Sequence, residues 1–185
     1  MSENFKQYTL SLLTEDSSGV LSQVSRLFAS TGYNIKSLAV GTTNDPTLSR
    51  MTIEVMAKDE HSIEFLCNRL RKLFPVHSVK RLDSHRSIRR ELRLIKVRTK
   101  DSVERNEVIQ IANIFRASII DVSEETLTIA AIGEEEKLSA ISRLIGKAEI
   151  LEIASTGIVA VERGELTIHE DTKEKDEFDY GKNVR

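Results

Sequence analysis

The chain has 185 residues, of which 39% are hydrophobic and 30% charged, with a formal net charge of −2. This length fits one large domain or two small ones, and the composition is typical of a globular protein. The near-neutral charge gives no general attraction to nucleic acid, and no apolar run is long enough to cross a bilayer. The N-terminal sequence MSENFKQYTL has neither a signal-peptide core nor an Arg/Ser-rich presequence. We therefore expect a cytoplasmic protein, either in a bacterial cytosol or in a plastid stroma if the gene is plastid-encoded.

The cysteine and histidine residues exclude two common kinds of site. Cys67 is the single cysteine, so no disulfide can form within the chain. It lies in an apolar helical pattern and is expected to be a small buried hydrophobe. The four histidines are scattered along the chain without the spacing of metal ligands. The sequence therefore predicts no metal site.

The first half of the chain alternates between strand and helix patterns. Strands are expected at residues 8–14, 35–41, 51–56 and 76–82. Two helices are expected from apolar residues at helical spacing, which are Val20, Leu21, Val24, Leu27 and Phe28 in the first helix and Ile63, Leu66, Cys67, Leu70 and Leu73 in the second. Ser17 or Ser18 can cap the first helix, Gly32 can end it, and Asp59 can cap the second. The predicted order is β-α-β-β-α-β.

The same order recurs in the second half. Strands are expected at residues 92–97, 118–122, 127–132 and 150–161. Helices are expected around Val108, Ile111, Ala112 and Phe115, and around Leu138, Ile141, Leu144 and Ile145. The predicted fold class is α+β, with two ferredoxin-like βαββαβ domains that each carry two helices on one face of an antiparallel sheet. The expected boundaries are 6–83 and 91–164 for the domains, 84–90 for a linker, and 165–185 for a polar, disordered tail.

In this topology the second and fourth strands lie at the edges of each sheet. Ile35, Leu38 and Val40 make the second strand apolar, and an exposed apolar edge invites pairing with another chain. Each half is also small for a core of its own. We therefore expect a homodimer that forms through this edge.

The loop before the first helix is the candidate binding site. Backbone N–H groups at a helix N-terminus suit a carboxylate, and charge-assisted hydrogen bonds of this kind contribute roughly 1.5–3 kcal/mol each. Gly19 either permits a turn or lets a ligand reach those groups. Asn34 either tolerates a left-handed turn or bonds a ligand from the start of the edge strand. Val20, Leu21 and Ile35 are core residues by default, and any that line a pocket would select ligand size.

Basic residues are frequent between Lys80 and Arg98. No aromatic residues interleave them, so a solvated linker face is favoured over a nucleic-acid site, and contact with a protein partner remains open. Three consecutive glutamates, Glu134 to Glu136, are expected to open a helix, where negative charge is favourable.

Motifs in both halves resemble one known family. In the first half they are Gly19, Leu27-Phe28, Gly32-Tyr33-Asn34-Ile35, Ser37-Leu38 and Asp45 to Thr52; in the second half they are Arg90-Glu91-Leu92, Leu94 to Val97, Ile114 to Ala117, Ile119 to Val122 and Ser155-Thr156-Gly157. Over about residues 6–164 the sequence is similar to the small regulatory subunit of acetolactate synthase. The resemblance implies an N-terminal ACT domain, a C-terminal ferredoxin-like domain and no catalytic residues.

The resemblance also implies a ligand and a partner. It implies a homodimer that binds valine, and that activates a large catalytic subunit and makes it sensitive to feedback. Thiamine diphosphate, Mg²⁺ and FAD would belong to that large subunit, and this chain would carry no cofactor. The residues carried over to the valine site are Asp16, Gly19, Val20, Leu21, Asn34 and Ile35. Asp16 stands where the family often has an amide.

Two other functions are compatible with the same pattern of elements. One is a free-standing ACT protein that binds an amino acid and regulates some other enzyme. The other is a small hydrolase of the acylphosphatase type on the same fold, but such chemistry needs an arginine in the anion-binding loop and residues 14–19 contain none. Fold alone does not decide between these functions.

Overall fold

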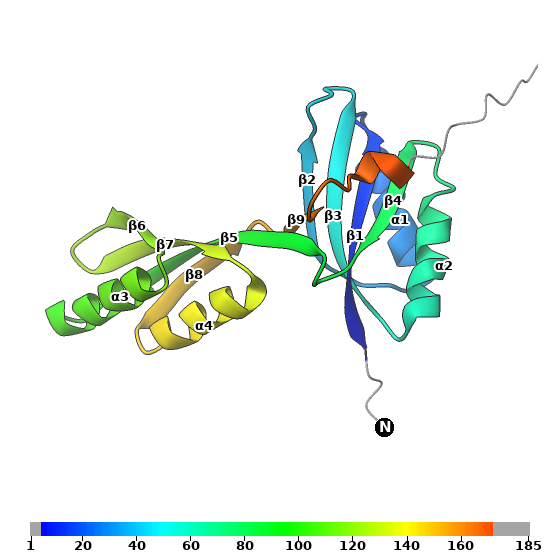
Figure 1. Cartoon of the computed structure of the whole chain (residues 1–185). Coiled ribbons are helices and arrows are strands. Elements are labelled where there is room, and N and C mark those ends of the chain that lie inside the picture. Colours follow the sequence, from blue (N-terminus) through cyan, green and yellow to red (C-terminus); the bar gives the residue numbers. More distant parts are fainter. Residues whose placement is uncertain (1–4, 172–185) are drawn as a thin grey trace, which may run out of the picture.

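The computed structural model describes residues 5–171, and it begins with a four-stranded antiparallel sheet. The elements of this first domain are β1 (Lys6–Glu15), α1 (Val20–Thr31), β2 (Ile35–Thr42), β3 (Leu48–Ala57), α2 (Glu60–Leu70) and β4 (Val76–Leu82). The strand order is β2-β3-β1-β4, so β2 and β4 lie at the edges as the sequence predicts. Both helices cover the same face of the sheet (Figure 1).

The second domain repeats this arrangement with its own sheet. Its elements are β5 (Ser87–Arg98), α3 (Ser102–Ile114), β6 (Ser118–Val122), β7 (Thr126–Gly133), α4 (Glu135–Ile145) and β8 (Glu149–Ser155), followed by β9 (Val159–Glu162) and a 3₁₀ helix, η1 (Ile168–Asp171). The strand order β6-β7-β5-β8 has the topology of the first sheet. The predicted pair of ferredoxin-like βαββαβ domains is therefore confirmed.

Helix α1 forms as its apolar spacing predicts, but it begins differently. Val20, Val24 and Phe28 are buried on its inner face. Gly32 ends the helix in a left-handed conformation, which glycine adopts without steric cost. The prediction of a serine cap is wrong, because the N-cap position is Gly19 and no side chain caps the helix.

Helix α2 confirms the predictions made for it. The carboxylate of Asp59 accepts a hydrogen bond of 2.7 Å from the backbone N–H of Ser62, as an N-cap residue does. Cys67 is fully buried, and burial raises the pKa of its thiol to about 11. It therefore behaves as a small hydrophobe. The helix ends at Leu70, and Leu73 packs against the same core from the following turn.

Each domain has its own hydrophobic core between sheet and helices. In the first, Leu10, Leu12 and Ile53 of the sheet meet the helices and are completely buried. In the second, Ile95 and Ile129 do the same. The cores are separate, so the contacts between the domains are made by other residues.

The predicted linker is part of a β-ribbon that joins the two domains. Residues 87–90 belong to β5 and pair with β9, while the rest of β5 pairs with β7 and β8. Figure 1 shows β5 running from one domain to the other. The predicted closing strand 150–161 is interrupted between β8 and β9, where Gly157 has a φ of +75°. We use the name joining ribbon for residues 87–90 and 159–162.

The joining ribbon meets the helix-free face of the first sheet through buried polar groups. Arg89 forms an ion pair of 2.7 Å with Glu54 of β3, whose side chain is 3% exposed. Glu54 also accepts hydrogen bonds from Gln7 (2.6 Å) and Ser37 (3.0 Å). A second ion pair joins Lys80 of β4 to a residue of the ribbon, Glu162.

These pairs correct the prediction of a solvated basic face only in part, because Arg81, Arg90 and Arg98 are still 40–48% exposed. Six of the eight basic residues between positions 80 and 98 form ion pairs with Glu side chains; these are Lys80, Arg81, Arg89, Arg90, Arg93 and Arg98. The side chains of Lys80 and Arg89 are only 17% and 21% exposed. Sequence alone does not show these partners, because several of them lie in distant elements.

Part of the predicted disordered tail is ordered. Residues 168–171 form η1, and Ile168 is 5% exposed. Its carbonyl accepts a hydrogen bond of 3.0 Å from the hydroxyl of Ser78 on β4, so the segment covers the same sheet face as the joining ribbon. The rest of the predicted tail, 172–185, lies outside the described residues.

We expect Arg89→Met to lower the free energy of unfolding by about 3 kcal/mol, because it leaves the buried Glu54 carboxylate without its cation. This value is at the low end for such changes, since Glu54 keeps its bonds from Gln7 and Ser37. The matched control is Arg98→Met, which breaks the exposed pair between Arg98 and Glu149 and should cost less than about 1 kcal/mol. Chemical denaturation measures both. Equal losses in the two variants would show that the buried pair does not hold the ribbon.

Candidate functional site

The loop before α1 is fixed to the neighbouring loops by backbone hydrogen bonds. The N–H of Asp16 donates to the carbonyl of Thr47 at 2.7 Å, and the N–H of Glu15 donates to the carbonyl of Pro75 at 2.9 Å. The carboxylate of Asp16 accepts a hydrogen bond of 3.1 Å from the hydroxyl of Ser49 on β3. This carboxylate is therefore anchored to the sheet while the residue remains exposed.

Gly19 places an uncapped helix end next to open space. Its φ of +88° is in the left-handed region, and a Cβ built on it meets no atom within 4 Å. No side chain caps α1, and its first turn has no acidic residue. The N–H of Val20 donates to the carbonyl of Ser17 at 3.4 Å, so the N–H groups that follow it and the positive end of the helix dipole can interact with an anion from outside.

The three apolar site residues differ in their exposure. Val20 is 3% exposed and belongs to the core, as predicted by default. Leu21, expected in the core, is 43% exposed because it lies on the outer side of α1. Ile35 is partly buried against the first core. Leu21 and Ile35 are therefore the two of these three whose side chains are not fully buried.

Asn34 lies at the other end of α1 from Gly19. The 12 residues of α1 separate the two positions, a length of about 18 Å at 1.5 Å per residue. Asn34 is exposed, and Arg116 is the only non-glycine residue with positive φ in the described part of the chain, so the left-handed interpretation of Asn34 is wrong. Just before it, the hydroxyl of Tyr33 donates to the carbonyl of Ser62 at 3.0 Å and fixes this turn on α2.

The structure therefore divides the six predicted residues into two groups. Asp16, Gly19, Val20 and Leu21 lie at one end of α1, and Asn34 and Ile35 lie at the other. Within one chain the two groups do not meet.

Residues that sequence reasoning missed follow immediately on β2. The pairing of β2 with β3 shifts between Ile35 and Ser37, which makes Lys36 the extra residue of a β-bulge. Its ammonium forms an ion pair of 2.7 Å with Glu135 at the start of α4, and this hydrogen bond lowers the pKa of the Glu135 carboxyl. The two residues are 99 positions apart, so no sequence pattern links them.

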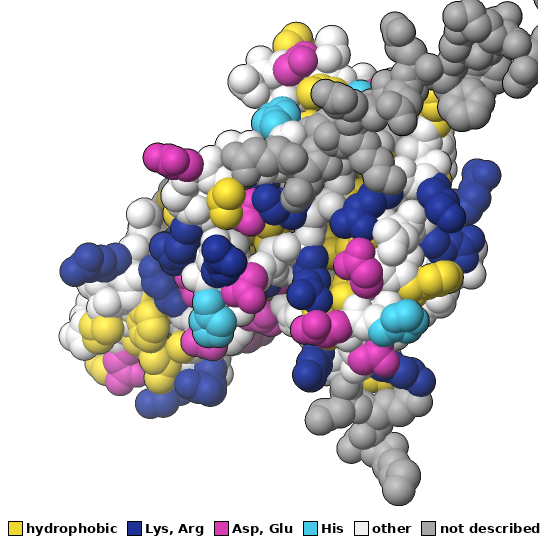
Figure 2. Space-filling model, turned by 45° about the vertical axis from the view of Figure 1, so that its right-hand side comes forward, with side chains coloured by type: hydrophobic (Ala, Val, Ile, Leu, Met, Phe, Trp, Pro, Cys, Tyr) yellow, Lys and Arg dark blue, Asp and Glu magenta, His cyan; other side chains and the backbone are white. Residues whose placement is uncertain are grey.

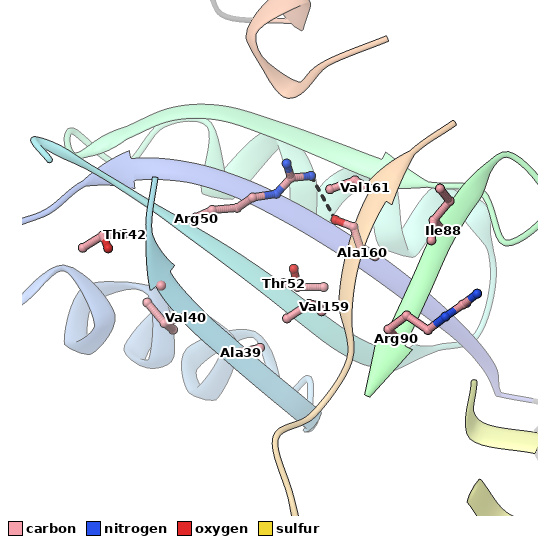
Figure 3. Close-up of a pocket in the computed structure, with 11 residues that line it drawn as sticks. Ala39, Val40, Thr42, Arg50, Thr52, Ile88, Arg90, Val159, Ala160 and Val161 are labelled. Atoms are coloured by element: carbon pink, nitrogen blue, oxygen red, sulfur yellow. Dashed lines mark hydrogen bonds between the residues drawn. The ribbon is translucent and has the colours of Figure 1, made fainter. Parts of the chain in front are cut away.

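Two cavities lie between the first sheet and the segments that cover it. One of about 390 Å³ lies over the helix-free side of β2 and β3 and is bounded by the joining ribbon (Figure 3). In that view Arg50 reaches the carbonyl of Ala160 on β9, at 3.0 Å. A second cavity, of about 340 Å³, is lined by residues including Lys36, Glu54 and Glu135. None of the six predicted site residues lines either cavity.

Several other kinds of site find no support in the described residues. Within residues 5–171 no three His, Cys, Asp or Glu side chains are grouped to hold a metal ion. No helix in the same range has the length and apolar character needed to cross a membrane. Figure 2 shows Lys and Arg side chains spread over one face with Asp and Glu among them, rather than gathered into a single basic patch.

Comparison with protein families accounts for both domains. Residues 10–78 match the ACT domain of small subunits of acetohydroxyacid synthase, described as "AHAS small subunit-like ACT domain". Residues 90–164 match the family described as "Small subunit of acetolactate synthase". The two matches fall on the two domains of the structure in order.

Individual relatives agree with these families along most of the chain. The acetolactate synthase small subunit of Mycolicibacterium smegmatis is 46% identical over 89% of this chain and 95% of its own length. That of Aquifex aeolicus is 40% identical over 91% of this chain and 87% of its own. The crystal structure of the Thermotoga maritima small subunit superposes with a TM-score of 0.80 at 37% identity, over 87% of this chain and 99% of that one. With two family models matched in order and similarity of this extent, the chain belongs to the family of acetolactate synthase small subunits.

Proposed function

We propose that this chain activates a thiamine-diphosphate-dependent large subunit of acetolactate synthase and makes it sensitive to feedback inhibition by valine. The observation that supports this most is the match of both domains to small subunits over nearly the whole chain. The chain itself carries out no chemistry in this proposal. Thiamine diphosphate, Mg²⁺ and FAD belong to the large subunit, which joins pyruvate to a second 2-oxo acid.

The chemistry of the two residue groups supports an amino acid as the effector. A carboxylate fits the uncapped N–H groups at Gly19, where open space lies in front of the backbone. The Asp16 carboxylate can pair with an ammonium group, and Asn34 can accept or donate hydrogen bonds. Leu21 and Ile35 offer partly exposed apolar surface to a short branched side chain. Together these residues offer an interaction to the carboxylate, the ammonium group and the side chain of valine.

A two-fold dimer brings these groups together. Thr42 at the end of β2 pairs with Ser49, which bonds Asp16, so the loop with Asp16 and Gly19 lies near the end of β2 while Asn34 lies at its start. If two β2 edges pair antiparallel about a two-fold axis, Asn34 of one copy lies beside the loop of the other. We therefore propose two effector sites per dimer, each shared between the copies.

Assays of the separate and mixed subunits test the proposed function. We expect this chain alone to form no acetolactate, and the mixture with its large subunit to be faster than the large subunit alone. Valine should inhibit the mixture more strongly than the large subunit alone. Acetolactate formation in proportion to the concentration of this chain alone, or a large subunit that does not respond to it, would contradict the proposal.

Substitution of Gly19 tests the effector site. We expect Gly19→Asp to abolish valine inhibition and to retain activation, because the new side chain blocks the N–H groups and repels a carboxylate. Gly19→Ala should lose sensitivity in part and cost about 1–2 kcal/mol of stability from its left-handed backbone. The measurement is the valine inhibition curve of the reconstituted enzyme.

Gly164→Ala is the matched control for backbone strain. Gly164 also has a positive φ, +75°, with no atom within 4 Å of a built Cβ. This variant should lose similar stability and keep valine inhibition. An unchanged inhibition curve in Gly19→Asp would refute the placement of the site.

A further inference from the structure

The three residues that follow Asn34 and Ile35 on β2 each meet a part of the C-terminal half. Lys36 forms an ion pair with Glu135 of α4. Ser37 lies beside Gly157, the glycine between β8 and β9, and also bonds Glu54, the partner of Arg89 in the joining ribbon. Leu38 lies against the same glycine. We use the name contact segment for residues 36–38.

The bulge at Lys36 explains how one side chain of this strand reaches the other domain. An extra residue in one strand bends it and redirects the side chain. The Lys36 ammonium lies 2.7 Å from Glu135 and 2.8 Å from the side-chain oxygen of Gln7. Glu134, the neighbour of Glu135, is held by Arg90 of the joining ribbon at 3.0 Å. The start of α4 is therefore tied to both β2 and the ribbon.

The backbone of the contact segment is packed tightly as well. A Cβ on Gly157 would lie 3.3 Å from the Cβ of Ser37 and 3.5 Å from the backbone nitrogen of Leu38. The turn between β8 and β9 therefore lies close to the contact segment, at a position that has no side chain of its own. Ser37 adds a polar link through the buried Glu54. A displacement at the start of β2 thus acts on α4, on the ribbon and on this turn together.

We infer that the contact segment couples the effector site to the C-terminal domain, with the ion pair between Lys36 and Glu135 as a coupling contact. This inference rests on the proposed effector site at Asn34 and Ile35. Allosteric coupling requires that the ligand favour one arrangement of the domains over another. Ligand contacts at Asn34 reach the C-terminal domain through the next residues of the same strand. A change in the contact segment should therefore alter inhibition by valine more than it alters the binding of valine.

The test is a double-mutant cycle on the ion pair in the enzyme reconstituted from both subunits. The variants are Lys36→Glu, Glu135→Lys and the two together, which restores opposite charges in exchanged positions. For each we would measure valine binding to the small subunit by calorimetry, activation without valine, and inhibition by saturating valine. Because the pair is about 40% exposed, we expect each single variant to weaken maximal inhibition about two- to fivefold. Valine affinity should change less than maximal inhibition does. The double variant with exchanged charges should recover the maximal inhibition of wild type.

The matched control is the exchange of Arg98 and Glu149, an ion pair of similar exposure within the second sheet. Its single and double variants should keep wild-type inhibition. The inference is overturned if the Lys36 and Glu135 variants are inhibited like wild type, if the exchanged pair is no better than the single variants, or if binding is lost as much as inhibition. If wild type itself neither binds valine nor responds to it, the proposed function fails as well, so the two failures are distinguishable.

Discussion

The carboxylate of Glu54 is buried on the sheet face that carries no helix, and a buried carboxylate needs a cation and hydrogen-bond donors. Arg89 supplies the cation from the joining ribbon, and Gln7 and Ser37 supply hydrogen bonds. Because β5 continues from this ribbon into the second sheet, satisfying one charge also orients the second domain. The orientation of the second domain relative to the first therefore depends on the ion pair between Arg89 and Glu54. Ser37, which bonds Glu54, is three positions after Asn34 in the sequence.

The geometry of α1 imposes a second constraint. Gly19 and Asn34 are separated by the length of a 12-residue helix, so in the proposed effector site a single chain contributes two separate halves. The apolar, unpaired edge of β2 lies between them. In the proposed dimer, the pairing of two such edges covers the apolar strand and completes the sites in one step. Effector binding and dimer formation would then be linked, because a ligand that contacts both copies stabilises their association.

Local patterns predicted much of this fold because they depend on neighbouring residues. Asp59 caps α2 and Gly32 ends α1 through contacts within a few positions. The joining ribbon depends on pairing between residues 87–90 and 159–162, and each of these segments is too short to show a distinct pattern. The same holds for Lys36 and Glu135, whose contact arises from a bulge and a domain orientation. The serines before Gly19 predict a side-chain cap for α1, but the N-cap position is Gly19 itself, which has no side chain to form one.

A mixed dimer tests most directly whether each effector site is shared between two copies. One chain would carry Asn34→Ala and the other Asp16→Ala, with different affinity tags to purify the pair. In a two-fold dimer with shared sites, one site of this pair is intact and the other has lost both side chains. Calorimetric titration with valine should then give about half the wild-type number of tight sites. Two equally weakened sites would contradict the account, because each pocket would then lie within a single chain.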